Sequence, residues 1–265
     1  MLTLPDLLLP AERAEINTLM DVAEYDDGRT TARGMAVEVK ANRQVSRRWL
    51  RIGSLDAILE TALRRSGLFR EALSPSGYSQ PIYSKYGVGD GYGPHVDAVM
   101  SGMPPIRQDI SMTIFLSPPE SYAGGELCLH HSGAERQSTK LAAGWAYAYP
   151  TTVIHEVLPV TAGERRVAVL WVQSFFRDSD IREMVADLRR CVEAAKRVPG
   201  ADPLPISKVL GNRARMFIAS LAEVKLGRMP VPNDRVMPRP GAASNHAGRL
   251  SGLAGTIRQT QRLRR

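Results

Sequence analysis

Cysteines and long apolar stretches are nearly absent from this sequence. Only two cysteines, Cys128 and Cys191, occur in 265 residues, which argues against a disulfide framework and favours a reducing compartment. No apolar run approaches the roughly 20 residues that a membrane-spanning helix needs. The first residues also lack the basic segment and the small-residue cleavage site of a signal peptide. We therefore expect a cytoplasmic protein with no membrane partner.

Acidic residues are scarce at the end of the chain, and this scarcity explains the net charge. Residues 226–265 contain eight arginines, no lysine and a single acid, Asp234, which gives +7 of the total charge of +8. The same residues are rich in proline, glycine and serine and have no apolar period, so we predict a disordered tail. Arginines without interleaved aromatics suit non-specific contact with phosphates. A solvated tail is the favoured interpretation, and nucleic-acid binding through it is kept as an alternative.

Hydrophobic periodicity divides the remaining chain into helical flanks and a β-rich centre. Apolar residues recur at helical spacing over 10–23 and 54–65. Between these helices, alternation predicts a half-buried strand, in which Met35, Val37 and Val39 face away from Ala36, Glu38 and Lys40. From residue 82 to 175 the period is that of strands separated by Gly and Pro turns, and the candidate strands are 82–86, 95–99, 110–116, 126–130, 145–149, 153–157 and 166–175.

Many short strands without intervening helices indicate a mainly β protein with flanking helices. A double-stranded β-helix core, of the jelly-roll or cupin-like kind, fits this pattern. Helical spacing returns after Asp178, where Asp180 and Glu183 have the spacing of a capping box, and a last helix is expected over 207–225. We thus expect a β-rich domain over 1–178, a helical extension over 179–225 and the arginine-rich tail over 226–265.

The chemistry is concentrated in residues 86–97, which read YGVGDGYGPHVD. Residues two apart on a strand point to the same face, so His95 and Asp97 are expected to project together. If His155 on a later strand meets them, two imidazoles and one carboxylate surround a cation and leave sites open, as in non-haem Fe(II) oxygenases. Arg165 follows on a strand whose alternation sends Arg166 to the opposite face. An inward guanidinium there is able to hold a carboxylate through a bidentate contact.

These residues resemble those of the Fe(II)/2-oxoglutarate-dependent dioxygenases and, more closely, of the PKHD-type hydroxylases, a prolyl-4-hydroxylase-like branch. An HxD pair, a His 58 residues later, an Arg ten beyond it and a Trp six further form a specific pattern. The resemblance extends over roughly residues 1–195. The matching segments, in the family's order, are 27–31, 39–44, 86–97, 113–117, 122–127, 149–152, 155–161 and 171–174.

The resemblance implies a role for each residue of the expected site. It makes the iron ligands His95, Asp97 and His155. It also implies that Arg165 pairs with the distal carboxylate of 2-oxoglutarate, and that Tyr86 and Thr113 are candidates for hydrogen bonds to that co-substrate. The implied cofactors are Fe(II), 2-oxoglutarate as co-substrate and O2, with L-ascorbate as an additional candidate.

Two residues depart from the family's pattern. Trp145 stands where relatives usually carry an acidic residue, and Phe115 stands where many prolyl hydroxylases have a tyrosine that helps to bind the co-substrate. The second departure bears on co-substrate affinity. The contacts that line the pocket are therefore of particular interest in the structure.

The function that this resemblance implies is hydroxylation of a C–H bond coupled to oxidative decarboxylation of 2-oxoglutarate to succinate and CO2. The substrate is left open between a peptidyl residue, an amino acid and a small metabolite, and the oligomeric state is also open. One alternative is a nucleic-acid dioxygenase recruited by the tail, although Trp171 stands where that group carries a second arginine. The other alternative is a non-catalytic sensor that binds a metal or a small acid.

Overall fold

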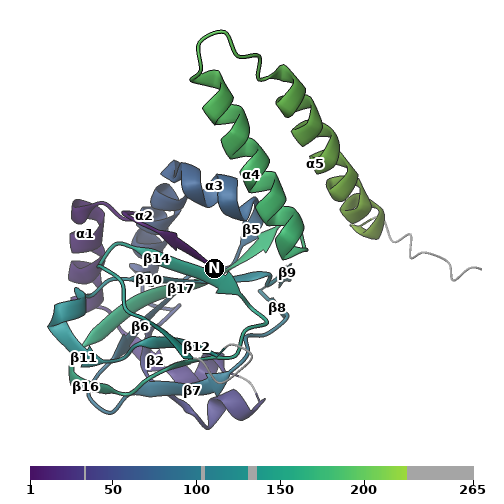
Figure 1. Cartoon of the computed structure of the whole chain (residues 1–265). Helices are drawn as coiled ribbons and strands as arrows, with labels where there is room; N and C mark the ends of the chain where they lie inside the picture. Colours follow the sequence, from purple (N-terminus) through teal and green to yellow (C-terminus); the bar gives the residue numbers. More distant parts are fainter. Residues whose placement is uncertain (33, 103–104, 131–135, 226–265) are drawn as a thin grey trace, which may run out of the picture.

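Two β-sheets face each other in the computed structural model, which describes residues 1–225 except 33, 103–104 and 131–135 (Figure 1). The larger sheet has eight strands in the order β1-β14-β10-β17-β6-β4-β2, with β5 beside β17, and all of its pairs are antiparallel. Its strands are β1 (Leu2–Leu4), β2 (Tyr25–Asp27), β4 (Arg43–Val45), β5 (Pro75–Tyr78), β6 (Ile82–Tyr86), β10 (Ile110–Phe115), β14 (Ala146–Pro150) and β17 (Arg165–Ser174).

The smaller sheet has five strands in the order β13-β12-β15-β7-β3, again antiparallel. Its strands are β3 (Lys40–Ala41), β7 (Gly91–His95), β12 (Leu127–His130), β13 (Arg136–Thr139) and β15 (His155–Val157). Two further pairs are formed by β8 (Met100–Ser101) with β9 (Ile106–Arg107), and by β11 (Tyr122–Gly124) with β16 (Val160–Gly163). The expected mainly β, double-stranded β-helix core with flanking helices is confirmed.

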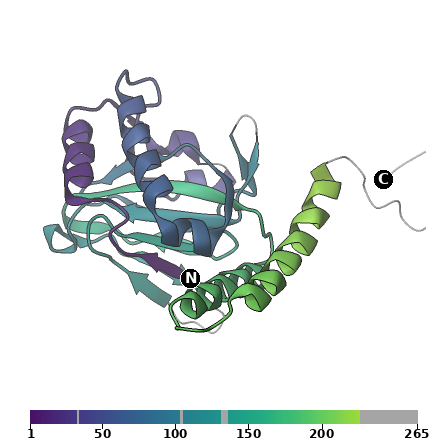
Figure 2. The ribbon, with the colours of Figure 1, turned by 90° about the horizontal axis from the view of Figure 1, so that it is seen from above.

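Three helices cover the outer face of the larger sheet: α1 (Pro10–Asp21), α2 (Ile52–Arg65) and α3 (Gly67–Leu73) (Figure 2). Pro10 occupies the first turn of α1, and the Glu12 carboxylate accepts a hydrogen bond from the Leu9 N–H, which satisfies an otherwise free donor. The apolar stripes of these helices pack against the outer side chains of the sheet and form one core cluster. A second apolar cluster fills the space between the two sheets.

The central strand β17 separates these two clusters through its alternation. Ala168, Leu170 and Val172 belong to the core beneath the helices. Arg165, Val169 and Trp171 instead line a cavity between the sheets. The strand therefore carries one polar and aromatic face into the interior of the β-sandwich, where a site can form.

The segment before β3 corrects one prediction. The expected strand over 35–40 is wrong, because Gly34, at φ +58°, begins a 3₁₀ turn, η2 (Gly34–Val37), and Met35 is 86% exposed. A further 3₁₀ turn, η1 (Gly28–Thr31), precedes it, and a third, η3 (Pro119–Ser121), lies before β11. Strand pairing starts only at Lys40, so Lys40 is buried rather than solvent-facing. A shift of one residue in strand register moves every side chain to the other face.

The chain ends, within the described residues, in a helical hairpin of α4 (Ser179–Lys196) and α5 (Leu204–Lys225) that extends away from the β core (Figures 1 and 2). The expected capping box of Asp180 and Glu183 is wrong, because the Asp178 carboxylate caps α4 by accepting from the backbone N–H groups of Asp180 and Ile181. In the part of the chain that is described, no helix combines the length and apolarity needed to cross a membrane. The predicted tail over 226–265 lies outside the described residues.

Candidate active site

Two histidines face each other across the smaller sheet. His95 on β7 and His155 on β15 are directly opposite in the antiparallel register, and their ring centroids are 4.2 Å apart. In each ring, Nδ1 lies within hydrogen-bond distance of a backbone carbonyl, Gly93 O at 2.8 Å and Val153 O at 3.0 Å. These acceptors favour the tautomer protonated at Nδ1, which leaves both Nε2 lone pairs free for a metal.

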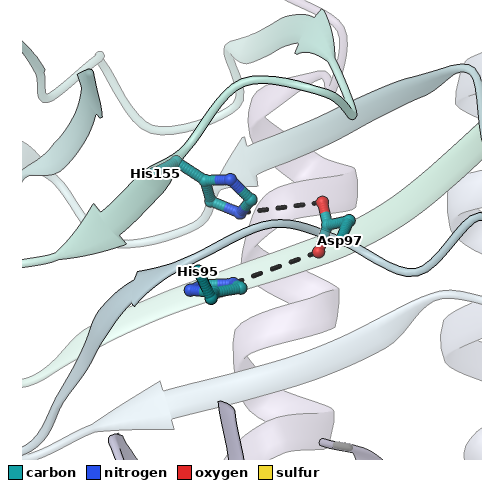
Figure 3. A group of neighbouring side chains, drawn as sticks. All are labelled: His95, Asp97 and His155. Carbon is teal, nitrogen blue, oxygen red and sulfur yellow. Dashed lines mark ion pairs between the residues drawn. The ribbon is translucent and has the colours of Figure 1, made fainter. Parts of the chain in front are cut away.

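The carboxylate of Asp97 completes the group, although not from a strand. The predicted strand over 95–99 is wrong, because β7 ends at His95 and Asp97 lies in the segment that follows. Its carboxylate nevertheless lies 4.0 Å from His95 Nε2 and 3.6 Å from His155 Nε2 (Figure 3). The Ser111 hydroxyl donates a hydrogen bond to the same carboxylate and orients it. Sequence reasoning missed this role of Ser111.

The donor set of His95, Asp97 and His155 fits a divalent transition metal. The three ligand atoms lie within 4.8 Å of one another, and among the described residues this is the group that combines three candidate ligands at such distances. Ligands about 2 Å from one ion at right angles are roughly 3 Å apart, so a small contraction brings the set into coordination. Burial, together with the nearby His155, lowers the pKa of His95 to about 4, so its imidazole is neutral at pH 7.

Arg165 lies in the same cavity and is 1% exposed. Its Cζ is 4.9 Å from the Tyr86 ring centroid, and within the described structure its Nε and Nη1 atoms have no hydrogen-bond partner. Its neighbour Arg166 points to the other face, where it pairs with Asp21 and Glu164. A buried guanidinium with unpartnered donors is costly unless an anion joins it.

Tyr86 and Thr113 also line this cavity, so the structure brings all six residues expected from the sequence into one space. Burial raises the pKa of Tyr86 and the Arg165 charge opposes that shift, which indicates that the hydroxyl and the guanidinium are neighbours. Tyr149, which sequence reasoning left without a role, has its ring centroid 5.1 Å from that of His155. Burial and the charge of Asp97 raise the pKa of Tyr149 well above its usual value, so its hydroxyl remains a hydrogen-bond donor.

Three further polar residues enter the cavity from β3, β4 and the residue between them, namely Lys40, Asn42 and Gln44. All three are buried, and the side-chain amide of Asn42 has no partner within the described residues. Their spacing of two residues was visible in the sequence. It was missed because the predicted strand placed Lys40 on the exposed face.

The two departures from the family's pattern have different surroundings. Phe115 lies near Arg165, with its ring centroid 5.8 Å from the Arg165 Cζ. Tyr122 approaches the same guanidinium: burial raises its pKa and the Arg165 charge lowers it. Trp145 instead donates a hydrogen bond to Asp6 near the N-terminus. A tyrosine hydroxyl is therefore present beside Arg165 even though Phe115 supplies none.

Comparison with known proteins identifies relatives of this chain. Residues 81–173 match the model of the 2OG-Fe(II) oxygenase superfamily. A PKHD-type hydroxylase of Picosynechococcus sp. is 42% identical over 186 residues, covering 70% of this chain and 83% of that protein. One of Paracoccus denitrificans is 38% identical over 208 residues, covering 77% and 91%.

Among solved structures, an oxidoreductase of the 2OG-Fe(II) oxygenase family from Burkholderia pseudomallei matches with a TM-score of 0.50 and 21% identity, covering 64% of this chain and 83% of that one. At this identity the likeness concerns the fold. The sequence matches make this protein an enzyme of the 2-oxoglutarate-dependent dioxygenase class. Within that class, the chain belongs to the PKHD-type hydroxylases.

Proposed function

We propose that this protein is an Fe(II)- and 2-oxoglutarate-dependent hydroxylase that couples the decarboxylation of 2-oxoglutarate to the hydroxylation of a peptidyl residue, an amino acid or a small metabolite. One observation carries the proposal. A single cavity holds both the His95, Asp97 and His155 group and the buried, partly unpartnered guanidinium of Arg165. A 2-oxo acid with a second carboxylate is a ligand that needs both features at once.

In this proposal each group of the chain has a defined task. His95, Asp97 and His155 hold the iron, and Arg165 holds the distal carboxylate of 2-oxoglutarate. Bound Fe(II) and 2-oxoglutarate supply the oxidising chemistry, in which O2 and 2-oxoglutarate are converted to succinate and CO2 while a substrate C–H becomes C–OH.

The surrounding residues support this chemistry by orientation and by exclusion of water. The backbone acceptors of the two imidazoles fix both rings, and Ser111 fixes the carboxylate. Leu127, Val157 and Val169 line the cavity with apolar side chains. A dry wall strengthens the electrostatic contacts within the cavity and protects reactive species from side reactions.

The experiment is a succinate assay with purified protein, Fe(II), 2-oxoglutarate and O2, run without substrate and then with candidate substrates. We expect Fe(II)-dependent succinate release that is abolished by His155→Ala. His130→Ala is the matched control, because His130 lies on the adjacent strand β12 and its ring contacts Glu156 instead. A variant His155→Ala with full activity would contradict the proposed ligand set, and co-substrate binding without any turnover would favour the sensor alternative.

The remaining expectations rest on residues or conditions beyond the site. L-ascorbate as an accessory reductant stays a prediction. A cytoplasmic location also stays a prediction, and the free thiols of both cysteines are compatible with a reducing compartment. Recruitment to nucleic acid would depend on residues 226–265, which lie outside the described chain. Deleting 228–265 and measuring RNA and DNA binding tests that alternative directly.

A further inference from the structure

A second chamber lies beside the co-substrate cavity. It has a volume of about 350 Å³ and shares six lining residues with that cavity: Lys40, Ile82, Tyr92, His95, Asp97 and Trp171. His155 and Arg165 line the first cavity but are not among the described residues that line the chamber. The metal-binding group therefore lies between two compartments. One compartment is accounted for by the proposed co-substrate, and the other faces the same ligands without an assigned occupant.

Of the described residues that line this chamber, Lys40 is the one that carries a full positive charge. It is 8% exposed, and within the described chain its recorded contacts are the Thr31 hydroxyl, 2.8 Å from Nζ, and the Tyr92 ring, whose centroid is 4.9 Å from Nζ. Neither contact is an acid. Burial lowers the pKa of Lys40 to about 8, with Asp97 and Asp27 opposing the shift. A buried ammonium without a carboxylate partner is expensive unless a ligand supplies one.

The position of this ammonium is fixed by its neighbours. Lys40 and Tyr92 are directly opposite each other on β3 and β7, and the Tyr92 ring stacks on that of His95 with centroids 3.6 Å apart. The Thr31 hydroxyl that accepts from Lys40 in turn donates to the side-chain Oε1 of Gln44. The contacts with Thr31 and Tyr92 thus hold the Lys40 ammonium over the Tyr92 ring, which itself stacks on His95 of the metal-binding group. Such support is what a preorganised binding site requires.

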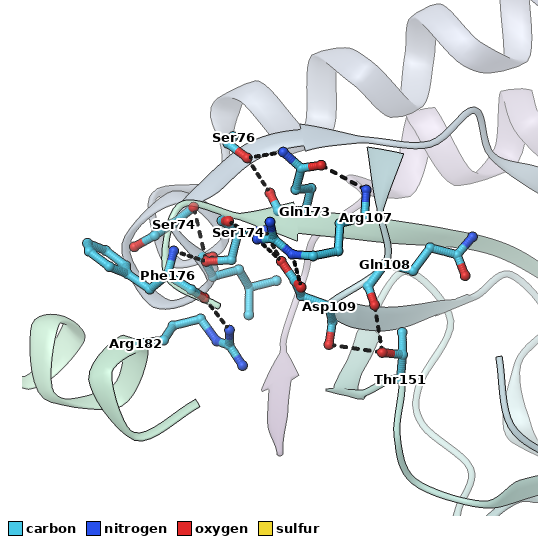
Figure 4. A network of polar contacts seen from close by, with 11 residues as sticks. Ser74, Ser76, Arg107, Gln108, Asp109, Thr151, Gln173, Ser174, Phe176 and Arg182 are labelled. Carbon is cyan, nitrogen blue, oxygen red and sulfur yellow. Dashed lines mark hydrogen bonds and ion pairs between the residues drawn. The ribbon is translucent and has the colours of Figure 1, made fainter. Parts of the chain in front are cut away.

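Other polar atoms of the chamber are also buried and unpartnered within the described residues. They are the Trp171 indole N–H, the side-chain Oε1 of Gln108 and the Ser101 hydroxyl. The polar network around Arg107 and Asp109 fixes the backbone on either side of Gln108, while its side-chain amide points away from that network (Figure 4). The chamber therefore offers both donors and acceptors to a ligand that has groups of both kinds.

We propose that this chamber binds the hydroxylation substrate through a carboxylate held by Lys40, with the Trp171 N–H as a second donor, so that the substrate is a small carboxylic acid of amino-acid type. The side-chain Oε1 of Gln108 is then available to accept from an N–H group of the same molecule. This inference rests on the proposed function, because it names the substrate class of the same site. The carboxylate would lie over Tyr92 and leave the rest of the molecule beside His95 and Asp97, where hydroxylation occurs.

Saturation-transfer NMR on protein loaded with redox-inert Zn(II) and 2-oxoglutarate tests this inference without turnover. The probes are two matched pairs, propionate with propionamide and L-proline with L-prolinamide. Inorganic phosphate, which has no C–H protons, is measured by its displacement of propionate. We expect each acid to bind at least about tenfold more tightly than its amide, because a charge-assisted contact is lost in the amide. We expect Lys40→Met to remove this preference and Lys40→Arg to retain part of it.

Lys85→Met is the matched control. Lys85 also lies over a tyrosine ring, with its Nζ 3.9 Å from the centroid of Tyr25. It directly precedes Tyr86 on β6, however, so its side chain lies on the opposite face of that strand from the Tyr86 side chain. Equal binding of acids and amides to the wild type, a preference that survives Lys40→Met, or tighter binding of phosphate than of either acid would each overturn the inference. Binding of 2-oxoglutarate is measured in the same samples. Its absence would refute the proposed function, whereas its presence without acid preference would refute only the substrate assignment.

Discussion

Replacing Arg165 by leucine is the sharpest perturbation of the proposed co-substrate site. The guanidinium is 1% exposed, and its Nε and Nη1 are unpartnered within the described residues, so a bound carboxylate would have a dry, two-donor contact. Removing one partner of such a buried charge pair costs about 2–5 kcal/mol. At 1.4 kcal/mol for each factor of ten, the dissociation constant of 2-oxoglutarate should rise roughly 30- to 3,000-fold.

The assay is anaerobic equilibrium dialysis of radiolabelled 2-oxoglutarate against Fe(II)-loaded protein. Pyruvate, which lacks the distal carboxylate, is measured in parallel, and its binding should be nearly the same in wild type and in Arg165→Leu. Arg166→Leu is the control, because this neighbour is an outward-facing arginine paired with Asp21 and Glu164. Unchanged 2-oxoglutarate binding in Arg165→Leu, or an equal loss in Arg166→Leu, would refute the assignment of Arg165.

A folding defect is separable from a binding defect in this variant. Because Arg165 is buried with unpartnered donors, its removal should not lower the melting temperature of the unliganded protein. It should abolish only the increase in melting temperature that 2-oxoglutarate causes. A variant that melts earlier without ligand would indicate that Arg165 is also structural.

Two further predictions concern pH and packing. Burial and the nearby His155 lower the pKa of His95 to about 4, below the usual 6.5, so the His95 proton does not compete with a metal near neutrality. In NMR of the metal-free protein, the imidazole resonances of His95 should therefore shift only as the pH falls through this low range, and a midpoint near pH 6.5 would contradict the prediction. Gly28→Ala should lower the free energy of unfolding by about 1–3 kcal/mol in urea, because the added Cβ would lie 1.6 Å from Asn42 Oδ1. The control is Gly53→Ala, whose added Cβ meets nothing within 4 Å and should not destabilise the fold. Equal urea midpoints for the two variants would contradict the prediction.

The parts of the structure that follow from local periodicity were predictable from the sequence. The alternation of β17 is long and its outer positions are apolar, so it correctly placed Arg165 inward and Arg166 outward. The change from helical to strand period correctly gave the mainly β core. Both features depend only on residues that are close together in the chain.

The parts that depend on long-range packing or on turn geometry were not predictable in this way. Nothing in the sequence around His95 shows that its cross-strand partner is His155, since that register is set by the whole sheet. Because Gly34 begins a 3₁₀ turn, the alternation that predicted an exposed Lys40 does not apply there, and Lys40 lines the cavity instead. Asp97 reaches His95 and His155 from beyond a strand end, where a period of two no longer applies.

The visible spectrum of the anaerobic protein, recorded after adding Fe(II) and then 2-oxoglutarate, tests the central claim most directly. Chelation of iron by the 2-oxo acid produces a weak metal-to-ligand charge-transfer band. The account predicts that this band forms in wild type and in the His130→Ala control and is absent in His155→Ala. Iron that is bound without the band in wild type, or a band that persists in His155→Ala, would contradict the claim that His95, Asp97 and His155 form the iron site.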